Sequence, residues 1–153
     1  MQDLFKDYFG HKVKIQLVRE TKPIKEYRIK TPDDVYRLVK DELTTLDREV
    51  FLVISLNTRN KVLGVNTVSV GSLNANLVHP REVFKPAILL NASSIILLHN
   101  HPSGEVEPSK DDIEKTDGLA RAGRLLGIEV VDHLIVGNNR FYSFLENDLL
   151  KSE

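Results

Sequence analysis

Two apolar runs constrain the fold of this chain more than any other feature. REVFLVIS (residues 48–55) and SSIILLH (residues 93–99) are rich in Val, Ile, Leu and Phe and have almost no polar residue at their centres. Alternate side chains of a strand point to opposite sides of a sheet, so a strand that is apolar throughout is buried on both faces. The sequence therefore predicts a central sheet with helices covering both sides.

The segment TPDDVYRLVKDELTTL (residues 31–46) is typical of an amphipathic helix. Thr31 suits the N-cap, Pro32 suits the first helical position, and Asp34 follows the cap by three residues. The apolar residues that share one face at helical spacing are Val35, Leu38, Val39, Leu43 and Leu46. We expect this face to cover one side of the sheet.

Two further helices are expected later in the chain. One begins at Pro80 in HPREVFKPAILLNA, where Pro86 is expected to kink or shorten it because proline lacks the backbone N–H. The other runs from Ser109 to Leu126 and stops at Gly127. Its expected apolar face consists of Ile113, Leu119, Ala122, Leu125 and Leu126.

Shorter β-rich runs complete the expected sheet. VLGVNTVSV follows REVFLVIS after the polar turn NTRN, which predicts a hairpin at the centre of the sheet. VVDHLIV and RFYSFL are separated by GNN and predict a second hairpin. Strands and helices alternate through the second half of the chain, so we expect an α/β fold with a mixed central sheet sandwiched by helices.

The chain of 153 residues is long enough for one well-formed core. We expect residues 31–150 to form that domain and residues 1–30 to form an N-terminal extension or a peripheral hairpin. KIQLV and EYRI, on either side of a Lys-Pro interruption, carry the hairpin prediction. An edge strand near residues 24–30 is a candidate for pairing between two chains, which would give a homo-oligomer.

Composition excludes several classes of function. The formal net charge is −1, from 21 basic and 22 acidic residues, which does not favour sequence-independent binding of nucleic acid. The chain has no cysteine, so disulfides and thiolate metal sites are excluded. The opening MQDLFKDYFG is charged where a secretory signal is apolar, and no run approaches the roughly 20 apolar residues of a membrane span. We expect a cytoplasmic protein without membrane contact.

The stretch HNHPSGEVEPSKDD (residues 99–112) has the residue types of a metal site. His99 and His101 lie two apart at the end of a predicted strand, on one face and about 7 Å apart at the backbone. If the next helix begins over this strand end, Asp111 or Asp112 can supply a third ligand and leave the fourth tetrahedral position for water. The alternative is that the histidines are exposed polar residues and that Ser109 and Asp112 only cap the helix.

The same stretch matches the JAMM, or MPN-plus, metalloprotease motif. Seven residues separate His101 from Ser109, and two more separate Ser109 from Asp112. The runs HPREVFKPAILLNASSIILLHNHPSG, PSKDDIEKT and VDHLIVG resemble the RadC branch of that family over roughly residues 30–145. The resemblance implies a JAB/MPN-like, cytidine-deaminase-like architecture. Full-length relatives often carry an N-terminal helix-hairpin-helix region that binds DNA, and residues 1–30 show no such pattern.

The resemblance also assigns roles to residues. It implies that His99, His101 and Asp112 bind one Zn²⁺, and that Ser109 donates a hydrogen bond to the oxyanion of the reaction. The family spacing selects Asp112 over Asp111 as the ligand.

The family's general base is a glutamate at the start of an upstream apolar strand. Glu49 in REVFLVIS is our prediction for it. Glu82 is the rival, although a glutamate in the first turn of a helix is also favoured by the helix dipole. Of the other histidines, His133 is expected in the core or beside a ligand, His79 at the start of a helix, and His11 has no assigned role.

Two functions follow from these expectations. The first is a zinc-dependent metallopeptidase or isopeptidase that acts on a protein or peptide. The alternative is a DNA-repair-associated protein that uses the same domain to process nucleic acid or to bind a partner, which the near-neutral charge disfavours. Two histidines and one carboxylate also suit iron or manganese, so the metal is left open.

Overall fold

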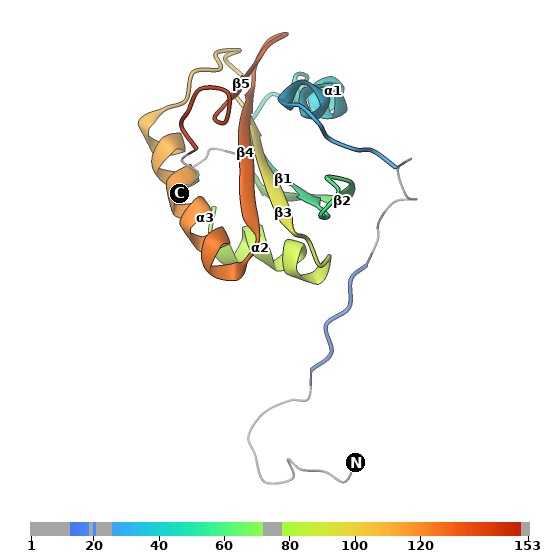
Figure 1. Cartoon of the computed structure of the whole chain (residues 1–153). Helices are drawn as coiled ribbons and strands as arrows, with labels where there is room; N and C mark the ends of the chain where they lie inside the picture. The colour runs from blue at the N-terminus through green and yellow to red at the C-terminus, as the bar shows by residue number, and fades with distance from the viewer. Residues whose placement is uncertain (1–12, 19, 21–25, 72–77, 151–153) are drawn as a thin grey trace, which may run out of the picture.

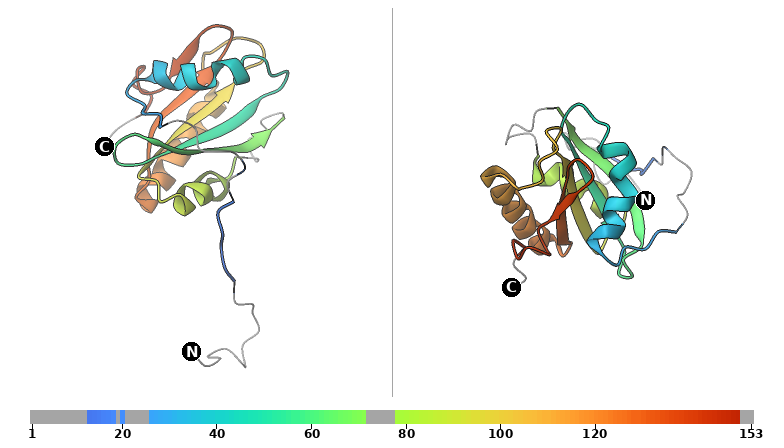
Figure 2. Two further views of the ribbon diagram at one scale, coloured as in Figure 1. Left: turned by 90° about the vertical axis from the view of Figure 1, so that its right-hand side faces the viewer. Right: turned by 90° about the horizontal axis from the view of Figure 1, so that it is seen from above.

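The computed structural model describes residues 13–18, 20, 26–71 and 78–150. In chain order the elements are α1 (Pro32–Leu43), β1 (Val50–Leu56), β2 (Val62–Val70), α2 (Pro80–Leu89), β3 (Ser94–Asn100), α3 (Lys110–Leu126), β4 (Glu129–Val136) and β5 (Phe141–Ser143). Figure 1 shows the sheet with α1 on one side and with α2 and α3 on the other, and the same layers are visible in both views of Figure 2. The predicted α/β fold, with a mixed sheet between helices, is confirmed.

The five strands form one sheet in the order β2-β1-β3-β4-β5. β3 and β4 are parallel, with α3 as the crossover between them, and the other neighbouring pairs are antiparallel. β1 and β3 are buried at every position, as their sequences predict. The hairpin of β1 and β2 was expected at the centre of the sheet, which is wrong for β2. That strand lies at the edge, and its partly exposed side chains alternate accordingly.

Helix α1 begins and packs as its sequence predicts. The Thr31 hydroxyl accepts from the Asp34 N–H at 3.3 Å, and the Asp34 carboxylate accepts from the Thr31 N–H at 3.0 Å, which makes a reciprocal cap. Val35, Val39 and Leu43 are buried against the outer faces of β1, β3 and β4. The helix thus fills one side of the sheet and leaves the other to α2 and α3.

Helix α3 turns to the sheet a face that matches the predicted one only in part: Leu119 is buried and Ala122 packs against the core, but the other three residues are exposed. Ile113, Leu125 and Leu126 are 38%, 90% and 49% exposed. The buried residues are Asp112, Thr116, Leu119, Ala120 and Gly123. The inward face is polar near the start of α3 because that end meets the histidines of the sheet, and small near its end because the backbone comes close to α2.

Helix α2 also departs from expectation, and the N-terminal segment is described only in part. Helix α2 is not shortened at Pro86 but continues to Leu89, since its buried residues keep it packed against the sheet. Residues 13–18 form no strand, and Arg28 makes one isolated bridge with Lys61 at the start of β2. The turn of the predicted hairpin, residues 21–25, lies outside the described residues. Within the described ranges, none of the helices is long and apolar enough to cross a membrane.

Candidate metal centre

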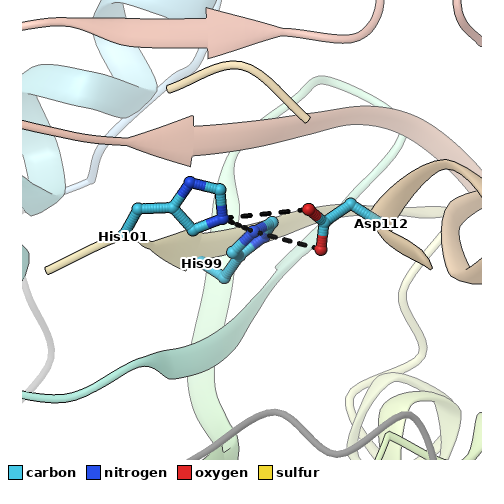
Figure 3. Close-up of side chains that lie close together, drawn as sticks. All are labelled: His99, His101 and Asp112. Atoms are coloured by element: carbon cyan, nitrogen blue, oxygen red, sulfur yellow. Dashed lines mark hydrogen bonds and ion pairs between the residues drawn. The ribbon is translucent and has the colours of Figure 1, made fainter. Parts of the chain in front are cut away.

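His99 and His101 lie where β3 ends, and the start of α3 lies over that strand end. His99 is fully buried on the sheet face that α2 and α3 cover, with its ring stacked 6.1 Å from that of Phe51. The chain turns after His101, and the first turn of α3 brings Asp112 back to the two imidazoles (Figure 3). The arrangement of helix and strand expected for a metal site is therefore present.

The three side chains offer ligand atoms at spacings that suit one small cation. The Nε2 atoms of His99 and His101 are 3.0 Å apart. Nε2 of His99 lies 3.4 Å from Oδ1 of Asp112, and Nε2 of His101 lies 3.8 Å from Oδ2. Zinc–nitrogen bonds of about 2.0–2.1 Å in a tetrahedron place neighbouring ligand atoms roughly 3.3–3.4 Å apart. Within the described ranges, this is the one group of His, Asp and Glu side chains close enough to share a metal.

Each imidazole is held through its other nitrogen, Nδ1. Nδ1 of His101 lies 2.9 Å from the carbonyl oxygen of Glu105. A carbonyl only accepts, so this nitrogen carries the hydrogen, and in the neutral ring the lone pair is on Nε2. Nδ1 of His99 lies 2.8 Å from Nε2 of His133. Burial lowers the pKa of His99 to about 4, even though Asp112 raises it, so the ring is neutral at pH 7.

Ser109 holds the Asp112 carboxylate in place. Oδ2 of Asp112 accepts from the Ser109 N–H at 2.8 Å and from the Ser109 hydroxyl at 2.6 Å. The same hydroxyl accepts from the Asp112 N–H at 3.1 Å, so Ser109 is also the N-cap of α3. Burial would raise the pKa of Asp112, but His99 and the hydrogen bonds from Ser109 outweigh it and lower the pKa. The same serine therefore caps α3 and fixes the position of the Asp112 carboxylate.

Glu49 lies at the start of β1, next to the strand that carries the histidines. Phe51 is paired with His99 in the antiparallel register of β1 and β3. The pairing of the two strands ends there, and Glu49 and His101 each lie two residues beyond this last pair. Glu49 is partly exposed.

Asn100 fixes the backbone on both sides of Glu49, and sequence reasoning missed it. Its side-chain oxygen accepts from the Val50 N–H at 2.7 Å, and its side-chain nitrogen donates to the Arg48 carbonyl at 3.0 Å. Asn100 is buried, and in the sequence it stands between the two histidines. Its position there, in HNH, is the one signal that could have identified it.

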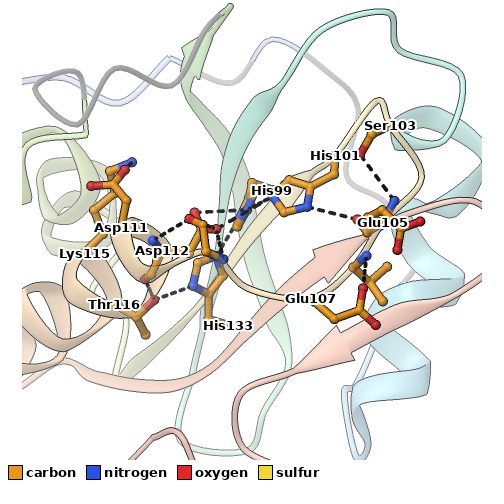
Figure 4. A network of polar contacts seen from close by, with 12 residues as sticks. His99, His101, Ser103, Glu105, Glu107, Asp111, Asp112, Lys115, Thr116 and His133 are labelled. Atoms are coloured by element: carbon orange, nitrogen blue, oxygen red, sulfur yellow. Dashed lines mark hydrogen bonds and ion pairs between the residues drawn. The ribbon is translucent and has the colours of Figure 1, made fainter.

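The rival acids lie outside this group. Glu82 sits on the surface of α2, where its carboxylate bonds Lys85 at 3.1 Å and approaches Arg81 at 3.5 Å. The bond to Lys85 lowers the pKa of Glu82. Asp111 pairs with the amine of Lys115 at 2.6 Å instead of turning to the histidines (Figure 4).

His79 and His133, the two other histidines among the described residues, lie outside the group that could hold a metal. His133 is fully buried beside His99, with its ring 4.7 Å from that of Phe144. Burial lowers the pKa of His133 well below its ordinary value. His79 precedes α2 without capping it through its side chain, and His11 lies outside the described residues. Thr116, which bonds His133, was missed, although it follows Asp112 by one helical turn.

A polar cavity of about 280 Å³ lies next to His101. It is formed by the end of α1, the turn after β3 and the turn after β4; its lining includes Thr44, Asn100, Ser103, Gly104 and Asn138. The His101 side chain is 15% exposed, whereas that of His99 is not exposed at all. Of the three side chains, that of His101 is therefore the most accessible to solvent.

Comparisons with known proteins agree with this geometry. The family model described as RadC-like JAB domain matches residues 29–149. A UPF0758 protein from Desulfitobacterium hafniense is 55% identical over 122 residues, which cover 80% of this chain and 54% of the relative. A UPF0758 protein from Moorella thermoacetica is 57% identical over 122 residues, covering 80% and 53%.

A third relative, the UPF0758 protein of Alkaliphilus metalliredigens, is 50% identical over 130 residues, covering 85% of this chain and 56% of that protein. The chain thus spans about half the length of the curated relatives it matches. The resemblance carried by the HNHPSG stretch is confirmed by the family match over the whole folded region. The chain belongs to the family of RadC-like JAB domains.

Proposed function

We propose that this domain is a zinc-dependent hydrolase that cleaves peptide or isopeptide bonds. One observation carries the proposal: two imidazole Nε2 atoms and one carboxylate converge in a buried position at the end of β3. The family match supports it, because JAB-type domains include metallohydrolases. The activity of a longer protein that contains this domain is part of the same proposal.

The electrostatics of the group favour a cation. His101 directs an Nε2 lone pair at the site, and Nε2 of His99 faces it at 3.0 Å beside an ionised carboxylate. Lone pairs and a negative charge at such distances repel one another unless a positive ion lies between them. Two neutral nitrogens and one carboxylate oxygen suit zinc, and they also suit iron or manganese.

Three protein ligands would leave the fourth tetrahedral position for water. Zinc held there would supply Lewis acidity, which lowers the pKa of water and polarises a substrate carbonyl. The partial exposure of His101 gives a protein or peptide substrate a route to the site.

Glu49 is proposed as the general base. Its place at the start of β1, on the face of Phe51 and His99, lets its carboxylate accept a proton from water and deliver it to the leaving amine. The two hydrogen bonds from Asn100 hold the backbone of this segment against β3. Glu82 is a poorer choice, since its carboxylate is engaged by Lys85 on the surface of α2.

Ser109 is proposed to act first on Asp112 and then on the substrate. Its single hydroxyl hydrogen is given to Oδ2 of Asp112. A cation beside the carboxylate offsets the charge that attracts this hydrogen. The hydroxyl can then turn to an oxygen that gains negative charge during the reaction.

The first test is elemental analysis of protein purified without a chelator or an affinity tag that carries metal. We expect about one zinc per chain in the wild type and little in the His99→Ala, His101→Ala double variant. Screening of peptide and isopeptide substrates would follow. Absence of metal from the wild type after zinc is offered would contradict the proposal.

The DNA-associated alternative stays a prediction. It is examined by measuring DNA binding at increasing salt, because real phosphate contacts weaken steeply as salt rises.

A further inference from the structure

We infer that His133 is a positioning residue, and that with Thr116 it keeps Nε2 of His99 free of hydrogen and therefore ready to bind metal. The inference rests on the proposed function, because it concerns the same metal group. It depends on a series of three hydrogen bonds that begins at the ring of His99 and ends at the backbone carbonyl of Asp112 (Figure 4).

Thr116 determines which atom is the donor in each of these hydrogen bonds. Its hydroxyl lies 2.6 Å from the backbone carbonyl oxygen of Asp112 and 2.6 Å from Nδ1 of His133. A hydroxyl has one hydrogen, and a carbonyl oxygen only accepts. The hydrogen is therefore given to Asp112, and the hydroxyl oxygen accepts a hydrogen bond from Nδ1 of His133.

The tautomer of His133 then determines the tautomer of His99. A neutral imidazole that carries hydrogen on Nδ1 has its lone pair on Nε2. Nε2 of His133 lies 2.8 Å from Nδ1 of His99, so it accepts the hydrogen of that nitrogen. His99 consequently has its own lone pair on Nε2, which faces Asp112 and His101.

Burial leaves these groups no other partners. His99, Thr116 and His133 are at most 2% exposed, so solvent does not replace a missing bond. Phe51 and Phe144 lie against the His133 ring, at 5.6 Å and 4.7 Å between ring centres, and offer no hydrogen-bonding atom. Among the residues that the structure describes, Thr116 is then the one partner of Nδ1 of His133, and His133 is the one partner of Nδ1 of His99.

The opposite arrangement of hydrogens would close the site. If Thr116 gave its hydrogen to His133, then His133 would give one to Nδ1 of His99, and the hydrogen of His99 would be on Nε2. That hydrogen would point at Nε2 of His101, 3.0 Å away, where the metal is proposed to bind. The Asp112 carbonyl, by attracting the Thr116 hydroxyl, selects the arrangement that leaves the site open.

The test compares zinc affinities of Thr116→Val and Thr116→Ser with that of the wild type, by competition with a chelator. Valine has nearly the shape of threonine but no hydroxyl, whereas serine keeps the hydroxyl and is the matched control. We expect the valine variant to bind zinc about 10–100-fold more weakly, the range for groups that orient metal ligands, and the serine variant to bind close to the wild type.

A second measurement separates this role from a general loss of structure. Nitrogen NMR of protein with ¹⁵N-labelled histidine reports which ring nitrogen carries hydrogen. In zinc-free wild type we expect hydrogen on Nδ1 of both His99 and His133, and a change in this pattern in the valine variant. Denaturant unfolding of each zinc-free variant shows whether it is folded.

The outcomes are distinct. If the wild type binds zinc and folded Thr116→Val binds it equally well, the inference is wrong and the proposed function stands. Hydrogen on Nε2 of His99 in the zinc-free wild type also overturns the inference. A wild type that takes up no zinc overturns the proposed function and the inference with it.

Discussion

The Ser109 hydroxyl lies 2.6 Å from Oδ2 of Asp112 and accepts a hydrogen bond from the Asp112 backbone N–H. One serine therefore caps α3 and orients the carboxylate of the metal group. We expect Ser109→Ala to lower the free energy of unfolding of the zinc-free protein by about 0.5–2 kcal/mol, the usual cost of losing a cap. Denaturant unfolding with a chelator present measures this loss.

The matched control is Ser109→Thr, which keeps a hydroxyl at the cap. It should recover most of the stability and hold zinc better than the alanine variant. Equal stability of Ser109→Ala and wild type would show that the cap does not contribute.

The two adjacent aspartates should differ sharply in zinc binding. Asp112→Asn removes the negative ligand and is expected to lose zinc, because an amide is a weak ligand for that ion. Asp111→Asn removes only the pair with Lys115, in which Asp111 is about half exposed. We expect it to keep zinc, and to cost less than about 1 kcal/mol of stability. Elemental analysis of both variants checks the difference, and zinc loss from both would contradict the assignment.

The choice of general base is tested with two glutamates. Glu49→Gln should keep zinc but lower kcat by about 10²–10⁴-fold, the usual contribution of a general base. Glu82→Gln, which changes a surface carboxylate of α2, should leave kcat unaltered. The measurement is the rate on a substrate found by the peptide and isopeptide screen, together with the zinc content. The reverse result would move the role to Glu82.

Acid should destabilise the zinc-free protein over a window set by its buried histidines. The pKa of His99 is about 4 in the folded chain, against an ordinary value of 6.5. Between these values the unfolded chain binds the proton and the folded chain does not, so stability falls as the pH drops from about 6.5 toward 4. His133, whose pKa is lowered further by burial, adds to the same loss.

Unfolding in denaturant at several pH values measures that loss. His133→Gln is expected to reduce the acid-dependent part, whereas His79→Gln, at an exposed position, should not change it. A stability that is flat between pH 4 and 6.5 would exclude these buried neutral histidines.

Two glycines of α3 provide a test of how the helix packs. A Cβ at Gly123 would lie 2.4 Å from the Ile128 carbonyl oxygen, so Gly123→Ala should destabilise the domain by about 1–3 kcal/mol. A Cβ at Gly118 would meet nothing within 4 Å. Gly118→Ala should therefore stabilise the domain by roughly 0.5–1 kcal/mol through helix propensity. Thermal unfolding of both variants decides between this packing and one in which the two positions are equivalent.

The sequence was sufficient for the layers of the fold, and it singled out the three side chains that the structure brings together. The fully apolar β1 and β3 had to be inside, and the cap at Thr31 marked the start of α1. The spacing from His101 to Asp112 identified the family motif. These features depend on local chemistry, which a sequence carries directly.

The orientation of α3 was predicted only in part, because apolar spacing was a misleading guide there. Leu125 and Leu126 suggested an apolar inner face, yet both are exposed. The inner face is selected by contacts between distant residues: Thr116 with His133, and Gly123 beside Phe84. Such pairings depend on the order of the strands, which periodicity does not reveal.

The three side chains that could share a metal and their supports, His133 and Thr116, all come from the single β3-α3-β4 unit, residues 94–136, whereas Glu49 immediately precedes β1. In the proposed function, the residues that hold the ion and the residue that acts as general base therefore belong to different parts of the chain. If Glu49 is the general base, as proposed, a change at position 49 alone would leave a bound ion that only links β3 to α3. Related domains with the same fold could in this way be enzymes or proteins in which the metal is only structural.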